Sequence, residues 1–382
     1  MSLLPPTNAK IADQLSKSIV VAFPMHGQEK LSNEGYRTRD GHFIEWFSKM
    51  FSNRGAVAVA SRPDPYLLYV KSAKARSRAI HNTLDLSSAT LRIPSFRNRR
   101  LWWLTSASSY PKAIFSGEHP FVLWNPFVAM NSQFARGNRK IHFDLLDDWT
   151  THFAFAQMRP EVEAAYESAF ASATSVTANS EATLTLAHKY GRTDARLLTN
   201  GCDPERFMTD GRSTGPMTVG YVGKIGRRLD LDLILTASKA LPDVQFIFAG
   251  PFLDREYYQP MKDASNITLL GDVHYNDVPD LLTRFDIGWV PHLTGAGEVG
   301  GDVIKTYEYR AAGLPVLTTP VLGAGDRGLS EVHVQDPENH IKSLKEFQIT
   351  GPRVARVHES IPPEHTWENK AKTISDLILP VA

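Results

Sequence analysis

The feature that most constrains the fold is an alternation of short apolar strands with longer amphipathic helices. Runs such as 18–23 (SIVVAF) and 120–127 (PFVLWNPF) are continuously apolar, which is typical of strands buried on both faces. Residues 41–55 between them place apolar side chains at helical spacing. Strands that alternate with helices form parallel sheets covered by helices, so the sequence predicts an α/β fold.

The alternation stops in the polar stretch 208–217 and restarts with a new strand at 218–223 (TVGYVG). A chain of 382 residues also exceeds what one hydrophobic core usually covers. We therefore expect two Rossmann-like domains that face each other across a cleft, because ligands of such sheets bind beyond the carboxyl ends of the strands. The predicted parts are residues 1–207, residues 208–360, and a C-terminal helix in 361–382 that can cross back to the first domain.

Composition excludes several classes of protein. The formal net charge of +1 gives no polyelectrolyte signal for nucleic acid, and the single cysteine, Cys202, cannot form a disulfide within the chain. The first residues lack the basic and apolar runs of a signal peptide, and no apolar run approaches the roughly 20 residues that span a bilayer. The predicted location is cytoplasmic, with peripheral membrane contact left open.

Segments at the ends of the predicted strands resemble those of the GT-B glycosyltransferases in order and spacing. The segments are HFDLLDDW, VTANS and LLTNGCDPERF in the first half, and TVGYVGKIGRR, IFAGP, NITLLGDVHYNDVPDLL and IKTYEYRAAGLPVLTT in the second. The chain is most similar to family 4-like and glucuronosyltransferase-like bacterial members, and the resemblance covers about residues 120–325.

The resemblance implies a transferase that moves a sugar from a nucleotide diphosphate, expected to be UDP, to a glycan or lipid-linked acceptor in polysaccharide biosynthesis. It implies donor binding by the C-terminal domain and acceptor binding by the N-terminal domain. No metal or other cofactor is expected. Two alternatives remain open: transfer to a nucleic acid or protein, and a sugar-nucleotide binder without catalysis.

The glycine-rich turn at 223–228 (GKIGRR) is a candidate phosphate site. A sugar nucleotide leaves as a diphosphate anion, whose charge cationic side chains and helix N-termini can neutralise without a metal. Gly223, Lys224, Arg227 and Arg228 are the expected contacts, with Arg228 and Lys224 preferred. The alternative is a solvated basic turn.

The predicted helix in IKTYEYRAAG supplies a second group of donor contacts. Lys305 lies at the helix N-terminus, where a cation opposes the helix dipole unless an anion such as a diphosphate is bound. Thr306 lies in the same turn, and Glu308 resembles the family's ribose-binding glutamate. The alternatives are an exposed lysine at a frayed end and a glutamate stabilised by the dipole.

The sequence departs from the family motif at Gly300, where a first glutamate is expected to contact the donor sugar. Glu298 and Asp302 flank that position and are candidate sugar contacts. The missing glutamate leaves open whether transfer retains or inverts the sugar's configuration. A further loop with Val273, His274 and Tyr275 is expected beside the nucleobase; a turn before a helix is the alternative.

The acceptor side is expected to supply a general base if transfer inverts the sugar. Asp147 and Asp148 follow a predicted strand, and Asp148 is the preferred base or acceptor contact; helix capping is the alternative. Further candidate acceptor contacts lie in the loop after the first strand and at the end of a later one: Arg37, Arg39, Asp40, His42 and Asn125. The loop residues could also contact the donor, and helix capping by Asp40 is the alternative.

Residues 71–103 are basic and end in two tryptophans. They contain eight Lys and Arg residues but only one acidic residue, Asp85. Basic side chains beside aromatic ones suit an anionic membrane surface or a nucleic acid, and a solvated basic face over buried tryptophans is the alternative. The sequence does not indicate an oligomeric state.

Overall fold

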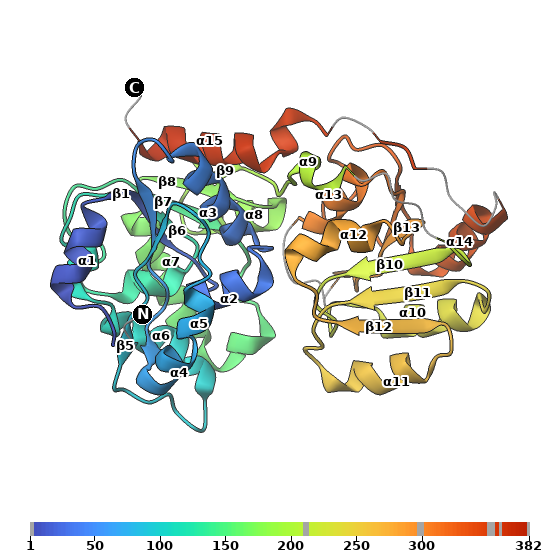
Figure 1. Cartoon of the computed structure of the whole chain (residues 1–382), viewed down its shortest axis with the longest axis horizontal. Helices are drawn as coiled ribbons and strands as arrows, with labels where there is room; N and C mark the ends of the chain where they lie inside the picture. Colours follow the sequence, from blue (N-terminus) through green and yellow to red (C-terminus); the bar gives the residue numbers. More distant parts are fainter. Residues whose placement is uncertain (1–3, 209–213, 296–301, 350–355, 359–360, 380–382) are drawn as a thin grey trace. The chain divides into compact units, whose positions relative to one another are not determined.

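The computed structural model describes residues 4–208, 214–295, 302–349, 356–358 and 361–379. Its contacts form two units: unit 1 comprises residues 1–198 and 370–382, and unit 2 comprises residues 199–369. Each unit holds one main parallel sheet with helices around it, which confirms the predicted α/β fold with two Rossmann-like parts (Figure 1).

Helices α9 (Pro204–Phe207) and α15 (Trp367–Ile378) lie near the points where the chain passes from one unit to the other. Helix α9, expected in the first domain, groups with unit 2. Helix α15 begins in unit 2, and its residues from Lys370 onward belong to unit 1.

Unit 1 is built on a seven-stranded sheet whose pairs are all parallel. The apolar runs of the sequence form its centre, because a parallel strand is buried on both faces. In spatial order the strands are β4 (Thr83–Asp85), β2 (Ala56–Val59), β1 (Ser18–Phe23), β6 (Phe121–Leu123), β7 (Ile141–Leu145), β8 (Ser175–Ala178) and β9 (Arg196–Leu197).

The helices of unit 1 follow the predicted spacing. In α3 (Arg39–Met50), Phe43, Ile44 and Phe47 lie on one face and are fully buried. The remaining helices are α1 (Asn8–Leu15), α2 (Gln28–Glu34), α4 (Tyr66–Lys71), α5 (Ala73–Arg76), α6 (Trp102–Thr105), α7 (Arg159–Ser172) and α8 (Glu181–Lys189). A small ladder pairs β3 (Asp64–Pro65) with β5 (Ala89–Thr90).

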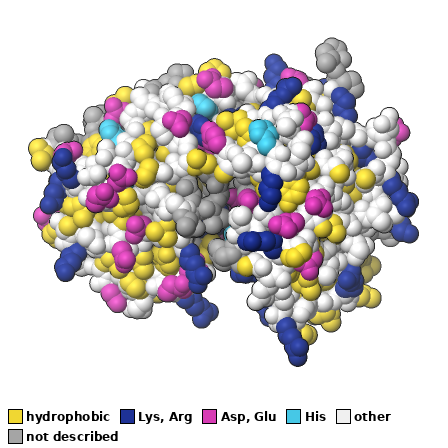
Figure 2. Space-filling model, turned by 180° about the vertical axis from the view of Figure 1, so that it is seen from behind, with side chains coloured by type: hydrophobic (Ala, Val, Ile, Leu, Met, Phe, Trp, Pro, Cys, Tyr) yellow, Lys and Arg dark blue, Asp and Glu magenta, His cyan; other side chains and the backbone are white. Residues whose placement is uncertain are grey.

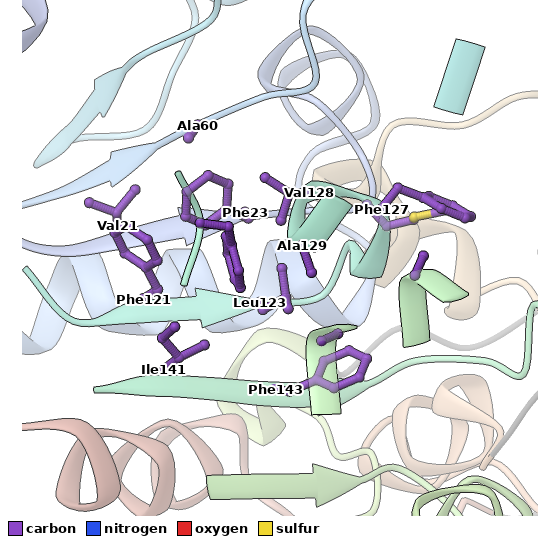
Figure 3. Packing of buried hydrophobic residues seen from close by; sticks show 14 of the residues in the cluster. Val21, Phe23, Ala60, Phe121, Leu123, Phe127, Val128, Ala129, Ile141 and Phe143 are labelled. Carbon is purple, nitrogen blue, oxygen red and sulfur yellow. The ribbon is translucent and has the colours of Figure 1, made fainter. Parts of the chain in front are cut away.

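An aromatic cluster forms the centre of the unit 1 core. Phe23 of β1 stacks on Phe115 with ring centroids 6.1 Å apart, and meets Phe121 edge to face at 4.9 Å. Figure 3 shows Phe23, Phe121 and Phe143 on neighbouring strands, with Val128 and Ala129 beside them. This cluster ties β1, β6 and β7 together and so fixes the edge from which the unit 1 loops extend.

Unit 2 is built on a six-stranded parallel sheet. A Cβ atom on Gly220 or Gly288 would lie 2.1–2.2 Å from the ring of Phe285 or Tyr309, so these glycines let aromatic side chains lie directly on the strands. The order is β12 (Ile267–Gly271), β11 (Gln245–Ala249), β10 (Thr218–Val222), β13 (Ile287–Val290), β14 (Val316–Thr318) and β15 (Val332–Val334). The helices, besides α9 and the start of α15, are α10 (Leu231–Ala240), α11 (Tyr258–Asp263), α12 (Val278–Leu282), α13 (Ile304–Ala311) and α14 (His340–Ile349).

The aromatic cluster gives a stability prediction. Phe23→Ala removes a fully buried ring, and we expect it to destabilise unit 1 by about 3–5 kcal/mol. Phe96→Ala removes an exposed ring of the same unit, and should change its stability by no more than about 0.5 kcal/mol. Native-state hydrogen exchange of the β1 amides measures both changes. Equal protection in the two variants would contradict the assigned core.

Candidate functional site

A glycine turn after β10 brings the phosphate candidates of unit 2 against α13. Gly223 has a φ of 155°, and a Cβ atom on it would lie 3.0 Å from Cε of Lys305. A Cβ atom on Gly250 would lie 1.8 Å from the Gly223 carbonyl oxygen. Glycine is therefore needed at the ends of both β10 and β11, because a side chain at either position would prevent the turn from approaching Lys305 so closely.

Lys305 lies within a cluster of cationic side chains. Burial lowers its pKa to about 8; Glu308 opposes this shift, while the charges of Arg228 and Lys224 add to it. Burial also holds the pKa of His292 well below its ordinary value, and Lys305 and Arg228 contribute, so this histidine adds no charge at neutral pH. The local excess of positive charge favours an anion at this point.

The N-terminus of α13 adds partial positive charge beside these cationic side chains. Val303 occupies the N-cap position and no side chain caps the helix there. The partial positive charge of the helix N-terminus and the Lys305 ammonium therefore lie in one turn. Leu293 donates its N–H to the Arg228 carbonyl at 2.8 Å, which holds the glycine turn beside the end of β13.

Glu308 lies one turn further along α13, where Tyr275 donates a hydrogen bond to its Oε1 at 2.6 Å. Both side chains are buried. Burial raises the pKa of Glu308, while the Tyr275 hydrogen bond and the charges of Lys305 and Arg206 oppose the rise. Arg206 of α9 lies over the Tyr275 ring at 4.9 Å. The structure therefore brings Lys305, Glu308 and Tyr275 together within unit 2, and their role in donor binding stays a prediction.

Asp302 is buried and holds the start of α13. Its carboxylate accepts from Tyr307 Oη at 2.5 Å, from the Asn200 N–H at 2.8 Å and from Arg327 Nε at 3.0 Å. Three internal donors thus engage the side chain predicted to contact the sugar. Thr306 is also buried in this turn. Glu298 and Gly300 lie outside the described residues.

Two other donor candidates have local partners. His274 accepts the Asn276 N–H through Nδ1 at 3.3 Å, which caps the short helix η7 (Tyr275–Asp277); Val273 precedes it and packs against the core. Arg227 is exposed, and its N–H and guanidinium lie 2.9 and 3.4 Å from the Asp254 carboxylate. Of these two arginines, Arg228 is the one whose charge lowers the pKa of Lys305.

In unit 1 the predicted acceptor residue Arg39 lies inside the protein. Its guanidinium makes two hydrogen bonds to Asp144, at 2.8 and 2.9 Å, and a third to the Leu198 carbonyl at 2.7 Å. Trp124 Nε1 donates to the same Asp144 carboxylate at 2.7 Å. This buried ion pair joins α3 to β7 near the carboxyl end of that strand.

Asp40 is fully buried and supports His26, a residue that the sequence analysis missed. Asp40 accepts the His26 N–H at 3.0 Å, and its Oδ2 lies 3.3 Å from His26 Nδ1. Burial alone would raise the pKa of Asp40, but His26 and Thr38 hold it well below its ordinary value. His26 remains partly exposed, with 19% of its side chain accessible. Arg37 bonds Glu34 at 3.0 Å, and His42 is buried.

The predicted base Asp148 closes a local turn. Its Oδ1 accepts from the Thr150 N–H at 2.8 Å and from Thr150 Oγ1 at 2.5 Å. The Asp147 carbonyl accepts from Tyr166 Oη at 2.6 Å. Asn125 is buried and caps the helix η4 (Pro126–Met130) by accepting the Phe127 N–H at 3.1 Å. Each of these residues follows a strand, as predicted, and each has a capping or turn contact.

A pocket of about 410 Å³ opens among the loops of unit 1. Its walls include residues that follow β1 (His26), β2 (Arg62), β4 (Ser87) and β7 (Trp149), so it lies beyond the carboxyl ends of the parallel strands. The sequence prediction did not include the short His-Gly turn after β1. That turn was the available signal, because it directly follows a buried strand.

Metal binding and membrane crossing both concern the described residues. They contain no group of three or more His, Cys, Asp or Glu side chains arranged to hold a metal ion. None of their helices combines the length and apolar character that crossing a bilayer requires. The expectation that no cofactor is needed stays a prediction.

Comparisons with known proteins identify similar sequences for part of the chain and similar folds for nearly all of it. Residues 216–347 match the family described as Glycosyl transferases group 1. TuaH of Bacillus subtilis (strain 168), named as a teichuronic acid biosynthesis glycosyltransferase, is 28% identical over 118 residues, which are 30% of this chain and 29% of TuaH. The chain thus spans less than a third of the length of this relative.

Solved structures resemble almost the whole chain. Sucrose-phosphate synthase from Thermosynechococcus elongatus has a TM-score of 0.68 at 13% identity, covering 94% of this chain and 98% of its own. Anabaena HepE, solved in complex with UDP and glucose, has a TM-score of 0.63 at 15% identity, covering 94% and 98%. The chain therefore has the GT-B fold, and residues 216–347 of its second unit match the Glycosyl transferases group 1 family.

Proposed function

We propose that this protein is a glycosyltransferase that moves a sugar from a nucleoside diphosphate, with UDP as the first candidate, to a glycan or lipid-linked acceptor. The observation that carries the proposal is the juxtaposition of Lys305, Arg228 and Lys224 with the N-terminus of α13 and the buried Glu308–Tyr275 pair. A diphosphate carries the negative charge that these cationic side chains favour, and a ribose supplies hydroxyls for the carboxylate.

The cationic side chains and the Glu308–Tyr275 pair have different roles in this proposal. Lys305 and Arg228 neutralise charge that develops on the departing diphosphate, which lowers the barrier for cleavage of the glycosidic bond. Glu308 accepts hydrogen bonds from the ribose while Tyr275 holds its other oxygen. The HepE complex with UDP and glucose supports UDP as the donor nucleotide by analogy of fold alone.

The acceptor binds in the unit 1 pocket in this proposal. The Asp40–His26 pair suits a general base, because a carboxylate on Nδ1 fixes the ring tautomer and leaves Nε2 to take a proton from a hydroxyl. Asp148 remains the alternative base predicted from the sequence. The cytoplasmic location also remains a prediction, with which the single, buried Cys202 is consistent.

Donor binding tests the proposal directly. Lys305→Ala should weaken UDP binding by about tenfold to a hundredfold, since a hydrogen bond to a charged group contributes roughly 1.5–3 kcal/mol. Lys239→Ala, which removes an exposed lysine of α10 in the same unit, should bind UDP as the unaltered chain does. Isothermal titration calorimetry with UDP, GDP and ADP measures both variants. Absence of binding to all three at millimolar concentration would contradict the proposal.

The pKa of Lys305 predicts how UDP binding depends on pH. Burial lowers the pKa of Lys305 to about 8, beside Glu308, Arg228, Lys224 and His292, whose own pKa is held well below its ordinary value. Raising the pH from 7 to 9 removes its charge, so UDP affinity should fall by up to about tenfold. Lys305→Arg keeps its charge throughout this range, and its affinity should stay nearly constant. Calorimetry at pH 7, 8 and 9 checks this; equal slopes for both proteins would exclude Lys305 as the titrating group.

Turnover distinguishes the two candidate bases. We expect His26→Ala to lower kcat by about 10²–10⁴-fold, the usual contribution of a general base, with unchanged UDP affinity. Asp148→Asn should lower kcat by less, because Asp148 is absent from the pocket wall and its Oδ1 is engaged by Thr150. The measurement is UDP release at saturating donor and acceptor. The reverse ranking would assign the base to Asp148.

A further inference from the structure

Unit 1 exposes large apolar side chains on a loop that has no covering element among the described residues. Leu91, Ile93 and Phe96 follow β5 within six residues, and each is 72–88% exposed. Leu67 and Leu68 of α4 are also exposed. Scattered exposed apolar residues are ordinary, but a cluster of this kind marks an interaction surface.

The fold brings these two groups into neighbouring segments. β3 pairs with β5 in parallel through Asp64–Ala89 and Pro65–Thr90. Helix α4 continues directly from β3, and Leu91 continues directly from β5. In Figure 1, α4 and the segment after β5 lie together along the lower margin of unit 1. We call Leu67, Leu68, Leu91, Ile93 and Phe96, with the cations around them, the docking surface.

The docking surface is strongly basic. Exposed Lys and Arg side chains recur from Lys71 to Arg100. Arg92 lies between Leu91 and Ile93, and Arg97, Arg99 and Arg100 follow Phe96. Between residues 66 and 117 the only acidic residue is Asp85, which pairs with the buried Arg76 at 3.2 Å. In Figure 2, seen from behind, Lys and Arg side chains lie beside hydrophobic ones at the lower edge of unit 1.

The two tryptophans of this region do not belong to the docking surface. Trp102 is buried and donates its Nε1–H to the Pro63 carbonyl at 3.0 Å. Trp103 packs on the core, with the Arg62 guanidinium 3.8 Å from its ring centre. Arg92 donates to the Thr105 carbonyl at 2.9 Å and to Ser108 Oγ at 2.7 Å. The loop is thus held at its base, while Leu91, Ile93 and Phe96 project from it.

We propose that the docking surface binds unit 1 to an anionic lipid bilayer, with the three loop side chains inserted at the acyl boundary and the arginines on the lipid headgroups. The exposed aliphatic side chains beside the basic ones decide between the candidate polyanions. Leucine and isoleucine cannot stack on bases as nucleic-acid surfaces require, whereas a bilayer interface buries them.

The docking surface also bears on the acceptor. Arg100, Arg76 and Trp103 line the 410 Å³ pocket, so the basic segment forms part of the pocket wall. A protein docked in this way would meet an acceptor carried on a lipid at the mouth of that pocket. This consequence rests on the proposed transferase function, while the membrane contact does not.

Vesicle binding of the full chain tests the contact. We expect co-sedimentation with vesicles of 70% phosphatidylcholine and 30% phosphatidylglycerol, weaker binding at 0.5 M salt, and little binding to pure phosphatidylcholine. Leu91→Ser/Phe96→Ser and Arg97→Glu/Arg99→Glu should each reduce partitioning at least tenfold. Matched changes in unit 2, Met208→Ser/Ile349→Ser and Lys342→Glu/Lys345→Glu, alter side chains of similar exposure and should leave it unchanged.

Insertion has a separate readout because Cys202 is the single cysteine and is fully buried. An environment-sensitive thiol dye on Phe96→Cys should shift to the blue on anionic vesicles, and the same dye on Ile349→Cys should not. Partitioning that depends on the arginines but not on Leu91 and Phe96, without a dye shift, would overturn the proposal and indicate a general polyanion contact, which a DNA-binding titration would then detect.

Calorimetry with UDP separates this inference from the proposed function. All docking-surface variants should bind UDP as the unaltered chain does, since their changes lie in unit 1. Vesicle binding without UDP binding would reject the transferase proposal and leave the membrane contact intact. UDP binding without vesicle binding would reject the docking surface alone.

Discussion

The proposed donor site depends on the partly buried ammonium of Lys305. Burial of this cation lowers its pKa, and the nearby charges of Arg228 and Lys224 lower it further, so the charged form is disfavoured in the unliganded protein. The surrounding structure maintains the arrangement: glycines at 223 and 250 admit the turn, and Asp302 fixes the start of α13. Unfavourable electrostatics of this kind are typical of sites that become balanced when a ligand binds.

Much of this arrangement could be predicted from local sequence. The buried strands follow from apolar runs, and Lys305 and Glu308 lie one turn apart on a single helix, so their spacing alone places them on one side of it. The roles expected for Lys305 and Glu308 come from the resemblance to glycosyltransferases. The glycine turn could also be predicted, because it directly follows β10.

Other parts depend on partners far away in the chain and could not be predicted. Arg39 binds Asp144 across 105 positions, so nothing near Arg39 indicates that it is buried. Asp302 likewise engages Asn200 and Arg327. Burial in the basic segment could not be predicted either. Trp102 and Arg76 are buried and Leu91 and Phe96 are exposed, and only the fold determines this difference.

The route of the chain between the units has a practical consequence. Unit 2 is one continuous stretch, 199–369, whereas unit 1 needs both the first 198 residues and the segment from Lys370 onward. In topological terms unit 2 is an insertion into unit 1. Unit 2 can therefore be excised as a single fragment, while a truncation that stops before α15 deletes part of unit 1. A circular permutant that joins the two segments is the direct way to obtain unit 1 as one polypeptide.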